Sequence, residues 1–254
     1  MFKFFPSTKK KRITECVVLH SFKINRSKTR ELFDFIIAYF KSSCNIEFEF
    51  AGFYGESYDD KYGTLENISD KLQNFNWNEI VNFSLDVSDL RKRERTIGVE
   101  FEITRPTNLI LYFPGDLFFQ LDDFIKNCNS LFPIDYGYCY KTAEEYWITS
   151  YAIGDFSHSN GIVGMGSLKK SDFERWRRDC EKITTGFLRD IYNRNILSKT
   201  HLERQVNGKQ LKSYILGGAV GYLTSITDDL SLWILNDMQL DMVRKEIRNS
   251  GILI

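Results

Sequence analysis

The sequence predicts an α+β protein with a mostly antiparallel sheet covered by helices. Segments of strand length alternate with segments of helical spacing early in the chain, and three consecutive strands with short connections then predict an antiparallel meander. The 254 residues are 43% hydrophobic and 15% aromatic, which is enough apolar surface for a sizeable core. We expect the helices to cover one face of the sheet.

A single domain over residues 1–254 is the organisation that we expect. A possible seam lies near residues 154–166, where glycine and serine become frequent. It would separate an N-terminal lobe, residues 1–155, from a C-terminal lobe, residues 167–254. The chain has only four prolines and no long tract of serine and glycine, so it does not have the composition of a disordered protein.

The first third of the chain alternates strands and helices. Residues 13–22 form a continuous apolar run of strand length, which predicts a strand buried on both faces. Residues 27–41 carry apolar side chains at the spacing of a helix. Residues 46–53 alternate apolar residues with glutamates and predict a half-buried strand. The polar residues 55–63 are expected to form a loop.

The middle of the chain predicts a second helix, a meander of strands and a third helix. Apolar residues in 65–75 follow one another at spacings of 3, 4 and 3, which is typical of a helix. The expected strands are residues 81–87, 96–104, 108–113 and, after a helix that Asp116 could cap, 133–140. Residues 88–95 are the expected polar turn between the first two of these strands.

In the last part of the chain, capping patterns predict where helices begin. Thr142 and Glu145 have the spacing of a capping box that would open a short helix ending at Gly154. Ser171 and Glu174 form a second such pair, and the apolar spacing after it predicts one helix as far as Ile191. A strand pair near 221–223 and 230–235 is expected to precede a final helix. That helix would be capped by Asn236 or Asp237 and end at Gly251.

Charge is separated along a chain whose formal net charge is zero. Residues 45–90 carry ten carboxylates against two lysines, a net charge of −8. Residues 1–44 carry ten bases against three acids, and residues 161–215 carry twelve bases against six acids. Such blocks create local fields that steer partners and set association rates, but they do not determine a fold.

Cysteine usage predicts a reducing, cytoplasmic environment. The five cysteines are widely spaced in apolar surroundings, and no C-x-x-C pair occurs, which indicates buried, reduced thiols. No apolar run approaches the roughly 18 residues of a membrane span. We therefore expect no contact with a membrane.

The sequence offers no strong catalytic or metal-binding pattern. His20 ends an apolar strand, His201 lies in a polar segment, and His158 lies among serines next to Asp155. A catalytic triad needs groups that converge from separate elements, which local adjacency does not supply. The spacings of zinc and calcium sites are missing as well. We expect no catalytic residue, no metal and no cofactor.

Two weaker patterns leave an enzymatic alternative open. Residues Gly161–Gly166 are glycine-rich but lack the ending of a phosphate-binding loop. The basic segment 169–212 follows, although acids interrupt it and the isoelectric point of about 6.8 disfavours nucleic-acid binding. The alternative function is an enzyme that acts on a nucleotide or nucleic acid through these two segments.

Tyrosines and carboxylates occur together in segments that suit a protein interface. Tyrosine is favoured at interfaces because it offers a large rigid contact area and a polar tip. Carboxylates beside it would complement a basic partner protein. We expect these segments to form one docking surface. The predicted partner-binding residues are Tyr54, Glu56, Tyr58, Asp59, Asp60, Tyr62, Asp135, Tyr138, Glu144, Glu145, Asp155 and His158.

The chain resembles the bacterial immunity proteins encoded beside secreted polymorphic toxins, including effectors of type VI secretion. The residues that carry this resemblance are the acidic, tyrosine-rich segment 54–62 with Leu65–Leu72, Asp135–Tyr138, Gly161–Gly166, Phe187–Leu197, Leu230–Leu235 and Gly251–Ile254. The resemblance implies an α+β cytoplasmic protein without enzymatic activity that binds and neutralises one cognate toxin. It implies no particular binding residues. An adaptor associated with a phage or a secretion system is a third possibility.

Overall fold

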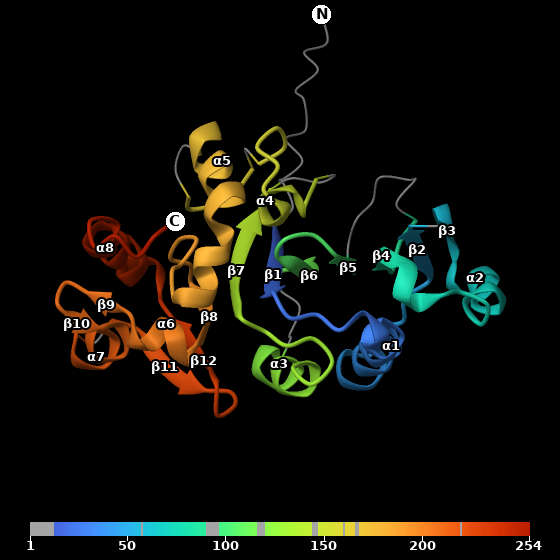
Figure 1. Ribbon diagram of the computed structural model, residues 1–254, viewed down its shortest axis with the longest axis horizontal. Helices are drawn as coiled ribbons and strands as arrows, with labels where there is room; N and C mark the ends of the chain where they lie inside the picture. The colour runs from blue at the N-terminus through green and yellow to red at the C-terminus, as the bar shows by residue number, and fades with distance from the viewer. Residues whose placement is uncertain are drawn as a thin grey trace, which may run out of the picture.

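The computed structural model describes residues 13–56, 58–89, 97–115, 120–143, 147–159, 161–165, 168–218 and 220–254. A ten-stranded sheet crosses the whole molecule, and every strand pairs with its neighbours in the antiparallel sense (Figure 1). Its strand order is β11-β12-β8-β7-β1-β6-β5-β4-β2-β3. The predicted α+β class is therefore confirmed.

The strands of this sheet are β1 Thr14–Ser21, β2 Phe50–Gly55, β3 Tyr58–Thr64, β4 Ile80–Asp86, β5 Gly98–Glu102, β6 Thr107–Pro114, β7 Tyr136–Thr142, β8 Arg194–Ser198, β11 Tyr222–Ser225 and β12 Leu230–Ile234. A separate hairpin pairs β9 Gln205–Val206 with β10 Lys209–Gln210. The α-helices are α1 Thr29–Cys44, α2 Leu65–Leu72, α3 Leu121–Cys128, α4 Ser150–Ile153, α5 Lys170–Asp179, α6 Lys199–Glu203, α7 Leu211–Gly217 and α8 Asp237–Arg248. Short 3-10 helices are η1 Arg26–Lys28, η2 Trp77–Glu79 and η4 Cys180–Thr185.

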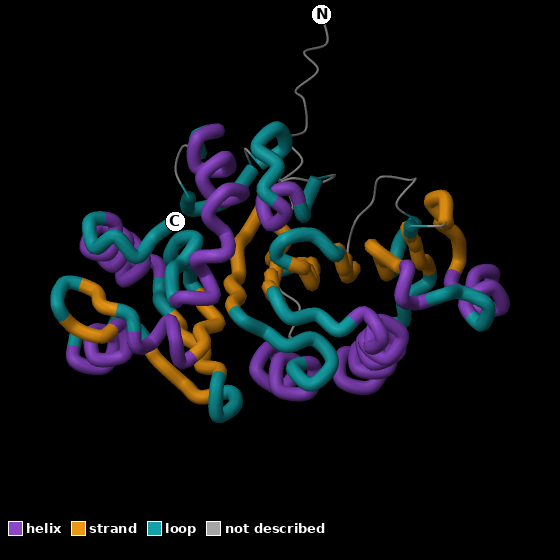
Figure 2. Tube along the Cα trace, in the orientation of Figure 1, coloured by secondary structure: helices purple, strands orange, loops and turns teal. Residues whose placement is uncertain are grey.

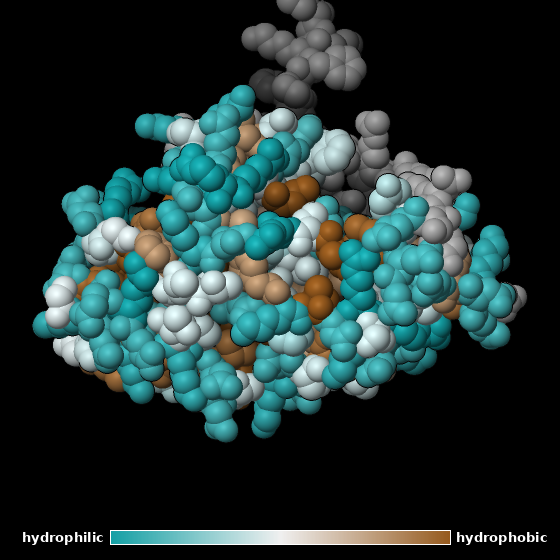
Figure 3. All heavy atoms as spheres, in the orientation of Figure 1, coloured by the Kyte–Doolittle hydropathy of each residue, from teal (hydrophilic) through white to brown (hydrophobic). Residues whose placement is uncertain are grey.

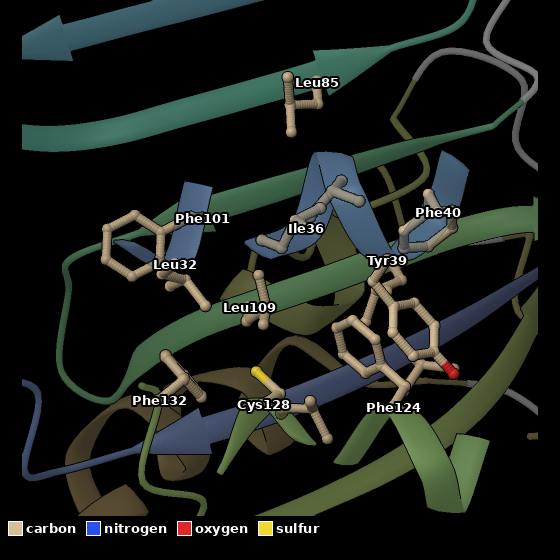
Figure 4. Packing of buried hydrophobic residues seen from close by; sticks show 14 of the residues in the cluster. Leu32, Ile36, Tyr39, Phe40, Leu85, Phe101, Leu109, Phe124, Cys128 and Phe132 are labelled. Atoms are coloured by element: carbon tan, nitrogen blue, oxygen red, sulfur yellow. The ribbon is translucent and has the colours of Figure 1, made fainter. Parts of the chain in front are cut away.

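Helices cover both faces of the sheet, so the expectation of a single covered face is wrong. Residues of α1, α2 and α3 pack on one face in a first hydrophobic core, part of which Figure 4 shows around Leu32, Phe101 and Phe124. Residues of α4 to α8 pack on the opposite face in a second core. In Figure 2 the helices accordingly lie on either side of the strands. Strand β1 serves both cores, because Val17 and Leu19 face the first and Cys16 and Val18 face the second.

The two cores do not extend equally along the sheet. The first core draws residues from β1, β2, β4, β5 and β6, and it also reaches Ile196, Leu230 and Leu232 at the other end of the sheet. Among the described residues, the second core includes none from β2, β3, β4 or β5. On that second face β4 carries the buried polar residues Ser84 and Asp86, and β5 carries the half-buried Glu100 and Glu102, whereas β6 and β1 present apolar residues.

The strands on both sides of residues 154–166 belong to the same sheet. Strand β7 pairs with β8 over Tyr136–Cys139 and Arg194–Leu197. The C-terminal strands β12 and β11 continue the sheet from β8. The hydrogen-bonded ladder is thus continuous across the possible seam.

Most predicted elements form, but residues 55–63 do not form a loop. They contain β3, which pairs with β2 to make the last hairpin of the sheet. Charged residues are tolerated there because an edge strand of a sheet is solvated along its outer side. The preceding strand also begins later than predicted: Glu47 and Glu49 are exposed and Ile46 and Phe48 are buried, yet β2 starts at Phe50.

The helix predicted to reach Ile191 ends earlier. Helix α5 tightens into η4 and stops at Gly186, whose φ of +88° is strained for residues with a side chain. The apolar spacing continues past that point because Leu188 and Ile191 enter the second core from an irregular segment. Side-chain periodicity therefore overstated the length of the helix.

Both predicted capping boxes are wrong in position. Thr142 is a buried residue of β7, and the short helix begins only at Ser150; Glu145 lies outside the described residues. Ser171 lies within the first turn of α5, where the Asp172 carboxylate accepts a hydrogen bond from the Lys169 N–H at 3.2 Å. The cap at Asn236 is confirmed, since its side chain accepts from the Gln239 N–H at 2.9 Å. The predicted cap Asp116 lies outside the described residues.

Candidate functional site

Strands β2 and β3 form a hairpin, residues 50–64, at one end of the sheet. This hairpin is termed the acidic hairpin. Tyr54 is 52% exposed, and Tyr62 stacks on Phe50 with ring centroids 6.0 Å apart. Glu56 forms an ion pair with Arg26 at 2.6 Å. Tyr58, Asp59 and Asp60 belong to β3, but their side chains lie outside the described part of the structure.

The strand register shows which residues of the neighbouring strands lie on the same face of the sheet as the exposed Tyr54. Tyr54 is opposite Asn82, which is opposite Glu102. Glu100 follows on the same side of β5, because Val99 and Phe101 point into the first core. Burial, and after it the nearby Glu100, raises the pKa of the Glu102 carboxyl. Tyr54, Asn82, Glu100 and Glu102 are termed the outer sheet face.

The second predicted segment lies at the centre of the sheet and has structural roles. Asp135 accepts a hydrogen bond from the Phe22 N–H at 2.7 Å and forms an ion pair with Lys23 at 3.6 Å, which joins the start of β7 to the end of β1. Tyr138 is fully buried in the second core, so its predicted role as a surface contact is wrong. Glu144 and Glu145 lie outside the described residues.

Asp155 and His158 form a local, partly exposed pair after α4. The His158 Nδ1 atom lies 3.0 Å from the Asp155 Oδ2 atom, and the imidazole stacks on Trp147 at a centroid distance of 4.3 Å. Hydrogen bonds, first from His158 and then from the Ser157 N–H, lower the pKa of Asp155. The Ser159 hydroxyl donates to the Asp155 carbonyl. These contacts stabilise a turn, and none of them joins His158 to a nucleophile.

The two predicted segments do not form one surface. Strand β7 is separated from β3 by six strand spacings of about 4.8 Å, or about 29 Å. The expectation of a single docking patch is therefore wrong, because spacing along the sequence does not determine the order of strands in the sheet. On the side shown in Figure 3, exposed hydrophobic residues occur only in small separate patches.

The other two histidines are buried among aromatic rings. The His20 Nδ1 atom lies 2.7 Å from the Asn108 Oδ1 atom, and burial lowers the pKa of His20 to about 3. The His201 Nδ1 atom lies 2.7 Å from the Ser198 hydroxyl oxygen as part of the cap of α6, and burial lowers the pKa of His201 to about 4. Neither imidazole is solvent-accessible. The described residues contain no group of three or more His, Cys, Asp or Glu placed to hold a metal ion.

A pocket of about 500 Å³ lies beside the turn at residues 161–165. Arg244 of α8 donates to the Gly164 carbonyl at 2.6 Å and to the Ile191 carbonyl at 2.9 Å. The Val163 N–H donates to the Lys141 carbonyl at 2.8 Å. The turn therefore uses a carbonyl and an N–H for internal contacts, whereas a phosphate-binding loop would direct successive N–H groups at a ligand.

Arg189, which no sequence pattern singled out, is only 8% exposed and lies within the second core. It donates to the Tyr138 hydroxyl and to the Tyr151 and Ala152 carbonyls. Its guanidinium lies 4.1 Å from the ring centroid of Tyr151 and 4.5 Å from that of Trp176. In the sequence it appears only as one base of the segment 169–212, so no local pattern distinguishes it.

Comparisons with known proteins provide no relative from which a functional site could be inferred. No family model, no curated protein and no solved structure matches this chain. None of the helices within the described ranges combines the length and apolar character needed to cross a bilayer.

Proposed function

We propose that this chain is an immunity protein that binds and neutralises a cognate secreted toxin, and that the acidic hairpin and the outer sheet face form the contact surface. The observation that carries the proposal is that β3 is the terminal strand of the sheet and also belongs to residues 45–90, the most acidic block of the chain. A terminal strand offers main-chain groups for pairing with a partner, and exposed tyrosine offers contact area.

The surface suits a basic partner protein. Glu102 lies on the outer sheet face, where burial, and after it the nearby Glu100, raises the pKa of its carboxyl. A cationic side chain that a partner brings close to Glu102 would favour its ionised form. Binding through this surface would bury a standard interface of roughly 1,600 Å², which is enough to occlude the active site of a toxin.

Charge reversal tests the proposed surface. The variant D59K/D60K should slow association with the toxin about tenfold at low salt and weaken the salt dependence of the on-rate, because complementary charges steer encounter. The partner used is the protein encoded by the adjacent gene, and rates are measured by surface plasmon resonance at two salt concentrations. A toxin-survival assay in cells then tests neutralisation.

The matched control is E203K/D228K, which reverses two exposed acids at the opposite end of the sheet. It should bind at the parent rate and protect cells equally well. Equal on-rates for D59K/D60K and the parent would show that the toxin does not dock on the acidic hairpin. Failure of the parent to bind the neighbouring gene product would contradict the proposed function itself.

A further inference from the structure

A second pocket, of about 390 Å³, opens beside the buried Arg189. Its lining residues come from the first turns of α5, the residues just before that helix, the end of α8 and the segment that follows α8. The residues that contribute charge are Lys169, Asp172, Arg175, Arg189, Asp190 and Arg248. This group is termed the cationic pocket.

Arg189 is a buried charge whose hydrogen-bond partners are all neutral. It donates to one hydroxyl and two carbonyls, and it forms no ion pair with any carboxylate of the described residues. A guanidinium carries five N–H donors, so these three contacts leave donor capacity unused. The Asp190 carboxylate interacts electrostatically with Arg189 but also with Arg244 and Arg248, so one carboxylate serves three guanidinium groups. An anion in the adjoining pocket would supply further negative charge beside the buried Arg189.

The rim of the pocket adds positive charge. Lys169 and Arg248 are exposed and form no ion pair with the described residues. Arg175 contacts Asp172 at 3.2 Å, and Asp190 contacts Arg244 at 3.5 Å. Four basic side chains and two side-chain carboxylates therefore line the pocket, and each of these two carboxylates already has a basic partner.

We propose that the cationic pocket binds a small phosphate-bearing ligand. A phosphate group accepts paired hydrogen bonds from a guanidinium and is favoured where several bases converge. The N-terminal end of α5, a ten-residue helix, contributes its positive dipole at the same wall. The pocket volume is within the range of small-molecule sites. This proposal does not depend on the toxin-binding function.

Titration calorimetry with three probes tests the site: inorganic phosphate, adenosine 5′-monophosphate and unphosphorylated adenosine, at constant ionic strength. The parent should bind the monophosphate, and adenosine should not bind. Binding of inorganic phosphate with equal affinity would show that the site recognises the phosphate group alone. Tighter binding of the monophosphate would show additional contacts to the rest of the ligand.

Charge reversal at exposed residues on the rim of the pocket tests binding in variants that we expect to fold like the parent. K169E/R248E should weaken binding of the monophosphate at least about tenfold, because two converging charges change sign. The control K212E/K245E reverses two exposed lysines that do not line the pocket, and it should retain the parent affinity. Arg189→Lys, if it folds with the parent circular dichroism spectrum, should also lose affinity.

Two results would overturn the proposal. One is the absence of binding by the parent to either phosphate probe up to about 10 mM, a concentration at which even weak sites are occupied. The other is equal affinity of K169E/R248E and K212E/K245E for the monophosphate. In either case Arg189 would serve only to hold the segment after η4 against α4.

Discussion

At the residue scale, burial determines what the ionisable side chains of this protein can do. His20 and His201 are neutral because their imidazoles lie in the aromatic second core, where His20 is also close to Arg189. His158 lies in a partly exposed turn with Asp155. Residue type and sequence neighbours made His158 the most suggestive of the three, yet its contacts are those of a turn.

The buried histidines predict a loss of stability in acid. Their pKa values are about 3 and 4 in the folded state, against about 6.5 when unfolded. The unfolded state therefore binds more protons below pH 6.5, and the free energy of unfolding decreases as the pH falls from about 6.5 toward 4. Each imidazole contributes a slope of up to about 1.4 kcal/mol per pH unit in that range.

Urea unfolding at several pH values measures this slope. His201→Gln should unfold at lower urea than the parent at pH 7.5, but its unfolding free energy should change less between pH 7.5 and pH 5. Met238→Gln provides the control, because it changes an 87% exposed side chain without adding or removing a titratable group, and it should keep the pH dependence of the parent. If His201→Gln retained the full slope, protonation of His201 would not be the cause.

At the element scale, helix ends are decided by backbone conformation and close contacts. Gly186 ends η4 with a φ of +88°, and a Cβ atom there would lie 2.6 Å from the Thr200 carbonyl oxygen at the start of α6. Gly208, in the β9–β10 hairpin, has a similar φ of +80° but no neighbour within 4 Å of that position. A side chain at Gly208 would therefore meet backbone strain alone, whereas a side chain at Gly186 would meet both backbone strain and steric overlap.

We expect Gly186→Ala to destabilise the protein more than Gly208→Ala. The Gly208 variant carries only the cost of a positive φ, about 1 kcal/mol, whereas the Gly186 variant must also displace backbone and should cost about 3 kcal/mol in total. Thermal unfolding monitored by circular dichroism compares the two variants directly. Equal losses would mean that α6 moves away from Gly186 without resistance.

At the scale of the whole molecule, one continuous ladder of hydrogen bonds joins both halves of the chain. Strand β1 pairs with β6 and β7 and is buried on both faces. The two cores therefore share a central strand, and neither lobe has its own complete sheet. The acidic hairpin and the cationic pocket lie on parts of the molecule that belong to different cores.

Hydrogen exchange should reveal a single cooperative unit. Amides of β1, β6 and β7 are expected to exchange slowest, with one common opening free energy, and amides at the terminal strands β3 and β11 should exchange faster. Mass spectrometry on peptides from residues 13–21 and 194–198 makes the comparison. Two distinct free energies for the strands before and after residues 154–166 would instead identify that segment as a domain boundary.

The sequence was sufficient where local chemistry decides the outcome. The apolar run of β1, the helical spacing of α1 and the cap at Asn236 predicted those elements because periodicity and end groups act within a few residues. The paired strands β4 and β5 followed from alternation. Segments without such a signal were missed: β8 and α7 are short and depend on packing.

Residue periodicity was enough to predict the α+β class, and the separation of charge along the chain is a property of the residue order. The strand order of the folded sheet sets which distant segments become neighbours, and periodicity does not encode that order. Tyr138 therefore entered the core, the strands of the two acidic segments came to lie six positions apart in the sheet, and Arg189 joined bases from α5 and α8 around one pocket.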